Sequence, residues 1–140
     1  AANHDWLCLT GGAIGQGLPV ALGAQMADMS RKVFALSGDG AGMYCIQSLW
    51  TMAREKLPIV TIIFANRNYR ILNIEMARTG ASNSGEPSQM LSLENPNLDY
   101  VKIAQGMGIK AISATNCEEF DTALENAINS NEPWLIEAII

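Results

Sequence analysis

An aspartate between two glycines marks the first place where this sequence could do chemistry. The apolar run VFALS (33–37) ends at Gly38, and Asp39 and Gly40 follow directly. In a parallel sheet, ligands bind beyond the carboxyl ends of the strands, where this acid is expected to lie. Glycines let backbone N–H groups approach a phosphate, but a carboxylate repels phosphate unless a cation lies between them. Magnesium is a suitable cation, because it takes oxygen ligands from one or two carboxylates and from phosphates.

A second group of oxygen ligands follows the next apolar run. The segment PIVTIIFA (58–65) ends at Asn66, and Asn68 lies in the same turn. One helix and one strand separate Asp39 from Asn66, which predicts that both lie at the same edge of a parallel sheet. The Asn66 amide oxygen and the Asn68 main-chain carbonyl then complete an oxygen shell around a metal bound to a diphosphate. Taken singly, GDG is also typical of a tight turn, and Asn66 of ordinary turn chemistry after a strand.

The elements that would position these residues alternate along the chain. Short apolar runs alternate with longer amphipathic stretches, which is typical of an α/β protein with a doubly wound, mainly parallel sheet and helices on both faces. We expect a sheet of about five or six strands. Five of them are assigned to residues 6–10, 33–37, 58–65, 109–113 and 133–140.

Helical patterns lie between these strands. The spacing of four apolar residues predicts one buried face for a helix over 43–56, and these residues are Ile46, Leu49, Trp50 and Ala53. A shorter helix is expected to open at Pro96 or Asn97. Thr115 followed by Glu118 predicts a capping box at the start of the last helix.

Composition excludes several classes of function. The chain has 140 residues, 49% of them hydrophobic, and a single domain over 1–140 is expected at this size. A net charge of -5 offers no basic surface for nucleic acid. No apolar run reaches the roughly 18 residues that cross a bilayer, and the N-terminus lacks signal-peptide features, so we expect a cytoplasmic protein without membrane contact. Three scattered cysteines and one histidine, His4, favour neither a disulfide framework, a zinc site nor a Ser-His-Asp centre.

A long polar connection interrupts the alternation. Residues 79–97 are rich in Gly, Pro, Ser and Asn. A connection of this length in a compact domain is usually functional or mobile. The sequence leaves open whether it is a plain surface loop or a lid or partner-contact segment.

The run from Gly38 to Asn66 resembles the diphosphate-binding motif of thiamine diphosphate enzymes, which begins with GDG and ends in Asn. Three further segments are similar to the acetolactate synthase and benzoylformate decarboxylase group: GGAIGQGLPVALGAQMA (11–27), IQSLWTMARE (46–55) and EPWLIEAII (132–140). The resemblance covers nearly the whole chain. It implies the C-terminal, diphosphate-binding domain of such an enzyme, with thiamine diphosphate and Mg²⁺ as cofactors.

The resemblance also assigns roles to individual residues. Asp39, Asn66 and the carbonyl of Asn68 match the magnesium ligands, although relatives commonly carry two adjacent Asn residues and here Ala65 precedes Asn66. The other matches are Gly38, Gly40 and Ala41 in the turn that holds the diphosphate, Ile14 as the apolar wedge that bends the cofactor, and Ile71 and Leu72 facing the substrate pocket. The bend brings the 4'-imino nitrogen close to the C2 proton, so that deprotonation becomes intramolecular. For the three apolar residues, plain core packing is the alternative.

The same resemblance implies that no catalytic residue lies in this chain. In this family, the glutamate that activates the cofactor comes from a separate pyrimidine-binding domain of a neighbouring subunit, and no segment here resembles that domain. We therefore expect a fragment of a longer polypeptide, or a subunit that needs a partner, in a homo- or hetero-oligomer and inactive alone. Candidates for an exposed apolar interface are Met26, Met43, Trp50 and Met52.

Two activities fit these expectations. One is acetolactate synthase-like: a small 2-oxo acid such as pyruvate is decarboxylated and the remaining acyl unit is transferred to a second 2-oxo acid. The other is simple decarboxylation with proton capture, as in the benzoylformate decarboxylase branch. Two further alternatives are a non-catalytic cofactor-binding or assembly module and an unrelated flavodoxin-like or Rossmann-like phosphate binder. The last is disfavoured, because no GxGxxG follows a predicted strand directly.

Overall fold

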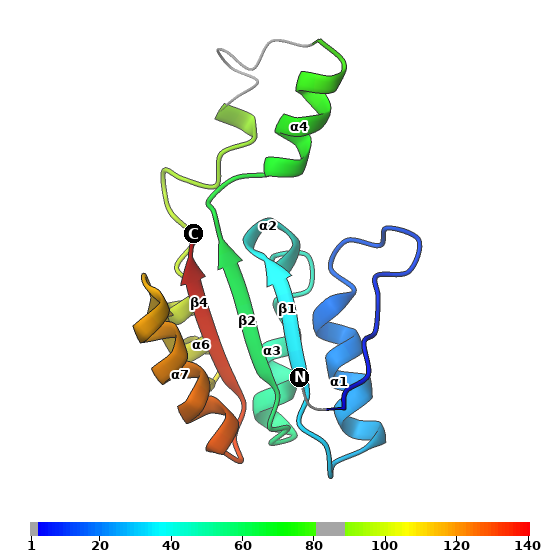
Figure 1. The fold of residues 1–140 in the computed structure, drawn as a ribbon. Coiled ribbons are helices and arrows are strands. Elements are labelled where there is room, and N and C mark those ends of the chain that lie inside the picture. Colours follow the sequence, from blue (N-terminus) through cyan, green and yellow to red (C-terminus); the bar gives the residue numbers. More distant parts are fainter. Residues whose placement is uncertain (1–2, 81–88) are drawn as a thin grey trace.

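The computed structural model describes residues 3–80 and 89–140, and its centre is a parallel four-stranded sheet (Figure 1). The strands are β1 (Phe34–Gly38), β2 (Val60–Ala65), β3 (Lys110–Ala114) and β4 (Trp134–Ile139), in the order β1-β2-β4-β3. All three neighbouring pairs are parallel. The two central strands are almost wholly buried, as expected for apolar strands covered on both faces. The predicted α/β fold with a parallel sheet is therefore confirmed.

The strand expected at residues 6–10 is wrong. This segment has no strand conformation, and its side chains Trp6, Leu7 and Leu9 are exposed. A strand is stable only where a neighbour supplies hydrogen-bond partners, and within the described ranges β1 pairs with β2 alone. Over residues 3–80 and 89–140 the sheet therefore has four strands instead of the expected number of about five or six, and no described strand pairs with the outer edge of β1.

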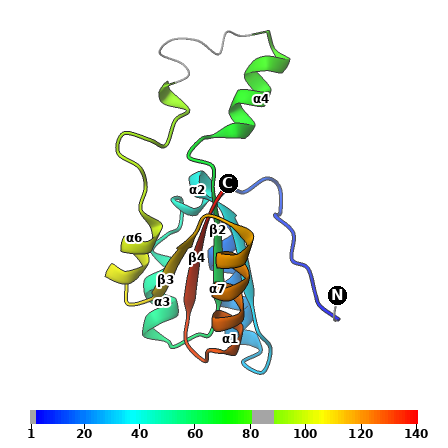
Figure 2. The same cartoon turned by 60° about the vertical axis from the view of Figure 1, so that its left-hand side comes forward.

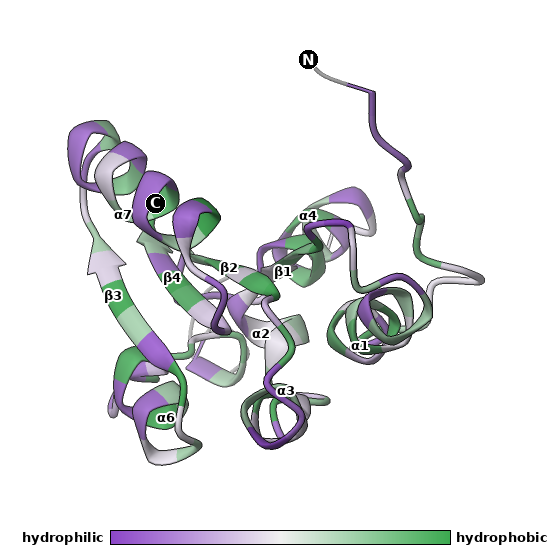
Figure 3. Cartoon of the chain, turned by 90° about the horizontal axis from the view of Figure 1, so that it is seen from below, coloured by the Kyte–Doolittle hydropathy of each residue, from purple (hydrophilic) through white to green (hydrophobic). Residues whose placement is uncertain are grey.

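Helices cover both faces of the sheet, as predicted, but unequally. On one face lie α1 (Gly17–Ala27), α3 (Ser48–Arg54) and α6 (Tyr100–Gly106), whose apolar side chains form the larger core with those of the strands. On the other face, α7 (Cys117–Asn129) packs Ala123 and Ala127 against Ile62 and Ile136. Seen from below, α7 lies across the sheet from α3 and α6 (Figure 3).

The helix expected over 43–56 is shorter than predicted. Residues 43–47 form turns after the single helical turn α2 (Asp39–Gly42), and the helix α3 covers only Ser48–Arg54. Trp50, expected in the buried face, is 52% exposed, and the Arg54 guanidinium lies over its ring at 5.3 Å from the centroid. Met52, expected at an exposed interface, is instead fully buried under the sheet. Helical spacing alone does not show where the apolar face of a short helix is centred.

Two helix starts also differ from expectation. The capping box of α7 lies one position later than predicted: the Asn116 side chain accepts from the Glu119 N–H at 2.9 Å, and the Glu119 carboxylate accepts from the Thr115 N–H at 2.7 Å. Helix α6 begins at Tyr100 instead of Pro96 or Asn97, because Asp99 caps it by accepting from the Lys102 N–H.

Helix α4 (Arg70–Arg78) stands away from the sheet beyond the carboxyl ends of the strands (Figures 1 and 2). None of its residues is buried. Part of the long connection 79–97, residues 81–88, lies outside the described residues, so the expectation of a functional or mobile loop stays a prediction. Across the described ranges, no helix is long and apolar enough to cross a membrane.

Candidate functional site

Asp39 is buried at the carboxyl end of β1, and hydrogen bonds engage both its side chain and its main chain. The strand ends at Gly38, which has extended backbone, and α2 begins at Asp39. The carboxylate Oδ1 accepts from the Gly40 N–H at 2.9 Å. The buried Tyr100 hydroxyl donates to the main-chain carbonyl of Asp39. Hydrogen bonds to both its side chain and its main chain therefore hold Asp39 where one strand becomes a helical turn.

The turn after β2 contacts this acid directly. Strands β1 and β2 are neighbours, with Gly38 opposite Phe64. The Arg67 N–H donates to Asp39 Oδ2 at 2.6 Å, a short charge-assisted bond. Arg67 has a left-handed backbone with φ 56, which is uncommon for a residue with a side chain and is often found at functional sites. The two strand ends therefore meet where the sequence spacing placed them.

The asparagines of this turn are ordered by hydrogen bonds within it. Asn66 Oδ1 accepts from the Asn68 N–H at 3.0 Å, which is an Asx-type turn. Asn68 Oδ1 accepts from the Asn73 side-chain amide on α4. The side-chain oxygens of Asn66 and Asn68 therefore both accept a hydrogen bond from a nearby residue.

The segment 91–93, which follows α4 in the chain, forms backbone hydrogen bonds with the same turn. The Tyr69 N–H donates to the Leu91 carbonyl at 2.9 Å, and the Leu93 N–H donates to the Arg67 carbonyl at 2.8 Å. The Tyr69 ring lies directly on the GDG turn, because a Cβ built on Gly40 would be 2.5 Å from that ring. Gly40 is therefore needed for close packing as well as for backbone access.

The apolar residues predicted to contact a cofactor or substrate do not belong to the core. Ile14 is 56% exposed, Ile71 is 61% exposed and Leu72 is 46% exposed. The alternative of plain core packing is therefore wrong for all three. Ile14 precedes Gly15, whose added Cβ would lie 2.5 Å from Tyr44 Cβ, so its loop packs against the turn that follows α2. Ile71 and Leu72 lie in the first turn of α4, directly after the asparagine turn.

The oxygen donors at this edge fit magnesium. The described residues contain no group of three or more His, Cys, Asp or Glu side chains that could hold a metal. The two turns that the Arg67–Asp39 hydrogen bond joins instead carry one carboxylate on Asp39, one amide oxygen on Asn66 and the main-chain carbonyl of Asn68. Mg²⁺ is commonly bound by few protein ligands of this type and fills its other positions with water and phosphate oxygens.

Residues 2–138 match the protein family described as "Thiamine pyrophosphate enzyme, C-terminal TPP binding domain". The chain belongs to this family. Among curated relatives of this thiamine pyrophosphate-binding domain, the protein named "Putative acetolactate synthase large subunit IlvX" of Mycobacterium tuberculosis is 46% identical over 100% of the chain. Benzoylformate decarboxylase of Pseudomonas aeruginosa is 37% identical over 90% of it. The chain spans 28% and 23% of the length of these two relatives.

Solved structures agree with the family assignment of the thiamine pyrophosphate-binding domain. The thiamine diphosphate-dependent 4-hydroxybenzoylformate decarboxylase of Rhodococcus jostii RHA1 superposes with a TM-score of 0.80 at 35% identity, covering 89% of this chain and 22% of that one. Benzoylformate decarboxylase of Polynucleobacter necessarius gives a TM-score of 0.80 at 28% identity, covering 93% of this chain and 24% of that one. The parallel sheet and its helices are therefore those of the family.

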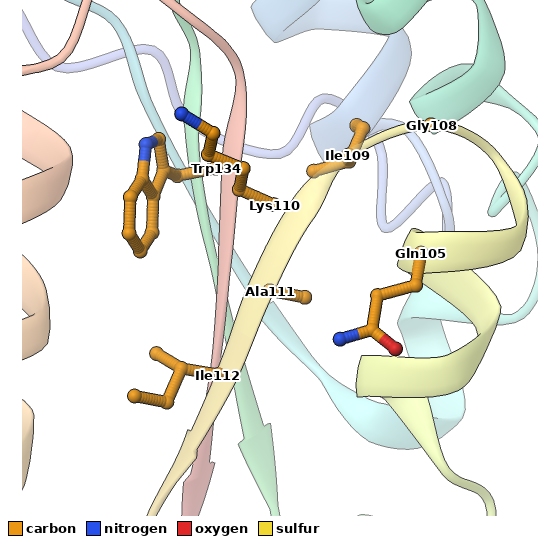
Figure 4. Close-up of a pocket in the computed structure, with 7 residues that line it drawn as sticks. All are labelled: Gln105, Gly108, Ile109, Lys110, Ala111, Ile112 and Trp134. Atoms are coloured by element: carbon orange, nitrogen blue, oxygen red, sulfur yellow. The ribbon is translucent and has the colours of Figure 1, made fainter.

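Two hollows of the thiamine pyrophosphate-binding domain lie beside β3. One is lined by Ile109, Lys110 and Trp134, at the amino ends of β3 and β4 and opposite the Asp39 end, and its side chains are mainly apolar (Figure 4). The other lies near the carboxyl end of β3 and has both charged and apolar side chains in its lining, Arg67 and Glu137 among them. Only the second borders the Asp39 site.

Sequence reasoning missed Glu137. This residue lies within β4 and is 4% exposed, and its Oε1 atom has no hydrogen-bond partner among the residues that the structure describes. Burial raises the pKa of its carboxyl group, while the nearby positive charge of Arg67 acts in the opposite direction. The signal was present in the sequence, because a charged residue inside the apolar run WLIEAII requires a specific partner.

Proposed function

We propose that this domain binds thiamine diphosphate through Mg²⁺ within an acetolactate synthase-like enzyme, which decarboxylates a small 2-oxo acid such as pyruvate and transfers the product to a second 2-oxo acid. The observation that carries the proposal is the 2.6 Å hydrogen bond from the Arg67 N–H to Asp39 Oδ2. It joins the turn that bears Asn66 and Asn68 to the acid between the glycines. The 46% identity to a relative named as an acetolactate synthase large subunit supports the choice of reaction.

Each residue of the site has a distinct task in this proposal. Asp39, Asn66 and the Asn68 carbonyl hold the metal, which in turn holds the diphosphate. The backbone around Gly38, Gly40 and Ala41 approaches the phosphates, and Ile14 supports the bent cofactor, while Ile71 and Leu72 border the substrate. Thiamine diphosphate, when bound, supplies the stabilisation of negative charge that decarboxylation of a 2-oxo acid requires. The protein supplies position, orientation and exclusion of water.

A partner domain completes the proposed enzyme. The curated relatives named above are about four times as long as this chain, which spans 28% and 23% of them. In the proposal, a pyrimidine-binding domain or subunit contributes the activating glutamate, the assembly is a homo- or hetero-oligomer in the cytoplasm, and residues 1–140 alone do not catalyse.

A second candidate is a benzoylformate decarboxylase-like enzyme that releases an aldehyde. It is favoured by the structural match to the Rhodococcus jostii decarboxylase, with a TM-score of 0.80 and 35% identity. Product analysis of the full-length protein separates the two activities. Acetolactate from pyruvate supports the first, whereas acetaldehyde from pyruvate or benzaldehyde from benzoylformate supports the second.

Calorimetric titration of the full-length protein with thiamine diphosphate tests the site itself. We expect binding when Mg²⁺ is present and none when it is removed by chelation. Asp39→Ala removes the carboxylate ligand and should weaken binding about a hundredfold, because a bond to a charged ligand atom is lost. Asp121→Ala on the exposed surface of α7 is the matched control and should bind normally. Metal-independent binding, or full affinity of Asp39→Ala, would contradict the proposal, and binding without turnover in the complete assembly would indicate a non-catalytic module.

A further inference from the structure

Helix α4 turns a polar side chain towards the rest of the protein. Of its nine residues, only Asn73 and Met76 are half-buried, and the others are exposed. Asparagine is a weak helix former, because its side chain competes for backbone hydrogen bonds. A contact outside the helix explains its presence here: the side-chain amide of Asn73 donates to Asn68 Oδ1, five positions earlier in the chain.

Asn68 belongs to the asparagine turn (residues 66–68), and its main-chain carbonyl is the proposed metal ligand. Its N–H donates to Asn66 Oδ1 at 3.0 Å, and its backbone forms an antiparallel bridge with Ser92. Over residues 3–80 and 89–140, no backbone N–H donates to the carbonyl oxygen of Asn68. The turn therefore fixes Asn68 through its N–H and its side chain and leaves the carbonyl for another ligand.

Asn73 joins this turn to the helix that follows it. Helix α4 stands beyond the carboxyl ends of the strands, and its first turn carries Ile71 and Leu72, the residues proposed to border the substrate (Figures 1 and 2). Asn73 comes directly after them, and its side chain reaches back to Asn68. A movement of this helix turn therefore changes the hydrogen bond that holds the Asn68 side chain.

We propose that Asn73 is a positioning residue of the metal site: its amide holds the Asn68 side chain, orients the main-chain carbonyl of Asn68, and couples α4 to metal binding. The inference rests on the proposed function, because it concerns Asn68 as a ligand. Asn73 acts through Asn68 and not on the metal itself. Hydrogen-bond partners of metal ligands commonly act in this way, by arranging the ligand atoms before the metal binds.

Asn73→Ala is the first test, because it removes the donor and places the strongest helix former in α4. The helix itself is therefore not weakened by the change. In the full-length protein we expect the dissociation constant for Mg²⁺ at fixed thiamine diphosphate to rise about threefold to tenfold, the loss expected for one hydrogen bond. Unchanged Mg²⁺ affinity would overturn the inference.

A double-mutant cycle with Asn68→Ala shows whether Asn73 acts through Asn68. Alanine at position 68 keeps the main-chain carbonyl and removes only the side chain that Asn73 holds. The double variant should therefore bind Mg²⁺ no more weakly than Asn68→Ala alone. If the losses of the two single variants multiply in the double variant, Asn73 acts independently of Asn68, and the inference fails.

Amide hydrogen exchange tests the coupling to α4. In the full-length wild type, binding of Mg²⁺ and thiamine diphosphate should slow exchange at residues 74–78, because an ordered Asn68 holds Asn73 more firmly. The slowing should be smaller in Asn73→Ala at saturating ligand. Equal slowing in the two proteins, or none in the wild type, would show that α4 is not coupled to the metal site through this bond.

Two controls separate this role from stability. Asn126→Ala makes the same exchange on the exposed surface of α7 and should bind Mg²⁺ as the wild type does. Ala77→Gly, at an exposed position of α4, weakens the helix without removing the Asn73 amide and should change Mg²⁺ affinity less than Asn73→Ala does. An equal loss in Ala77→Gly would mean that helix stability is the cause, and the inference fails. If the wild type binds no Mg²⁺ with thiamine diphosphate, the proposed function itself fails, which is a distinct result.

Discussion

At the scale of single residues, Glu137 shows what it costs to bury a carboxyl group. Only 4% of its surface is exposed, and among the described residues no hydrogen-bond partner reaches its Oε1 atom. Removing a charged group from water is unfavourable, and the raised pKa of Glu137 reflects this. The neutral carboxyl group is therefore favoured more in the folded protein than in the unfolded chain.

This leads to a prediction for the pH dependence of stability. Because the folded-state pKa of Glu137 lies above its usual value of 4.5, the folded protein binds this proton more tightly than the unfolded chain. The wild type therefore loses stability from this group as the pH rises from about 4.5 through the folded-state pKa. Glu137→Gln carries no charge to bury, so its stability relative to the wild type should rise over the same interval.

Urea denaturation at several pH values between about 4.5 and 8 measures this difference. The same exchange at the exposed Glu125 of α7 serves as the control. A constant difference between Glu137→Gln and the wild type across the interval would show that the carboxyl group is not perturbed in the folded state.

At the scale of elements, the site depends on two turns that pack on each other. The GDG turn follows β1, the asparagine turn follows β2, and the Tyr69 ring of the second covers Gly40 of the first. A methyl group on Gly40 would lie 2.5 Å from that ring, whereas one on Gly38 would meet nothing within 4 Å. Both glycines belong to the same motif, but only Gly40 is restricted by space.

We therefore predict different results for alanine at these two positions. Gly40→Ala must displace Tyr69 and should destabilise the fold by about 1–3 kcal/mol, the usual cost of overpacking. Gly38→Ala, whose φ of -74 suits any residue, should change stability by less than about 0.5 kcal/mol. Thermal denaturation checks both. Adding Tyr69→Ala to Gly40→Ala should recover most of the loss, and a double variant no more stable than Gly40→Ala would refute the steric explanation.

The same elements show what the sequence can and cannot predict. Periodicity and the position of the GDG and asparagine turns predicted strands at β1 to β4 and the meeting of two strand ends, because parallel neighbours end at one edge. The composition of residues 6–10 could not show that they form no strand, because a strand also needs a neighbouring strand to pair with. The Tyr100 contact with Asp39 joins residues 61 positions apart, and only the packing of α6 on the sheet creates it.

At the scale of the whole molecule, the sheet is covered unevenly. Helix α7 packs on β3 and β4, and the face of β1 on that side is left open (Figure 3). Phe34, Leu36 and Phe64 on this face are 44%, 43% and 36% exposed. Strand β1 also has no neighbour on its outer side within the described residues. An apolar face beside an unpaired strand edge is a typical site of association between chains.

We therefore predict that residues 1–140, produced alone, self-associate through β1. Sedimentation velocity should show a sedimentation coefficient that rises with protein concentration. The double variant Phe34→Lys and Leu36→Lys places two charges on the open face and should sediment as a monomer, because pairing would then bury charge. Ile128→Lys on α7 removes another exposed apolar side chain away from β1 and should associate as the wild type does. A wild-type chain that stays monomeric at all concentrations, or association abolished equally by Ile128→Lys, would show that the β1 face is not the site of contact.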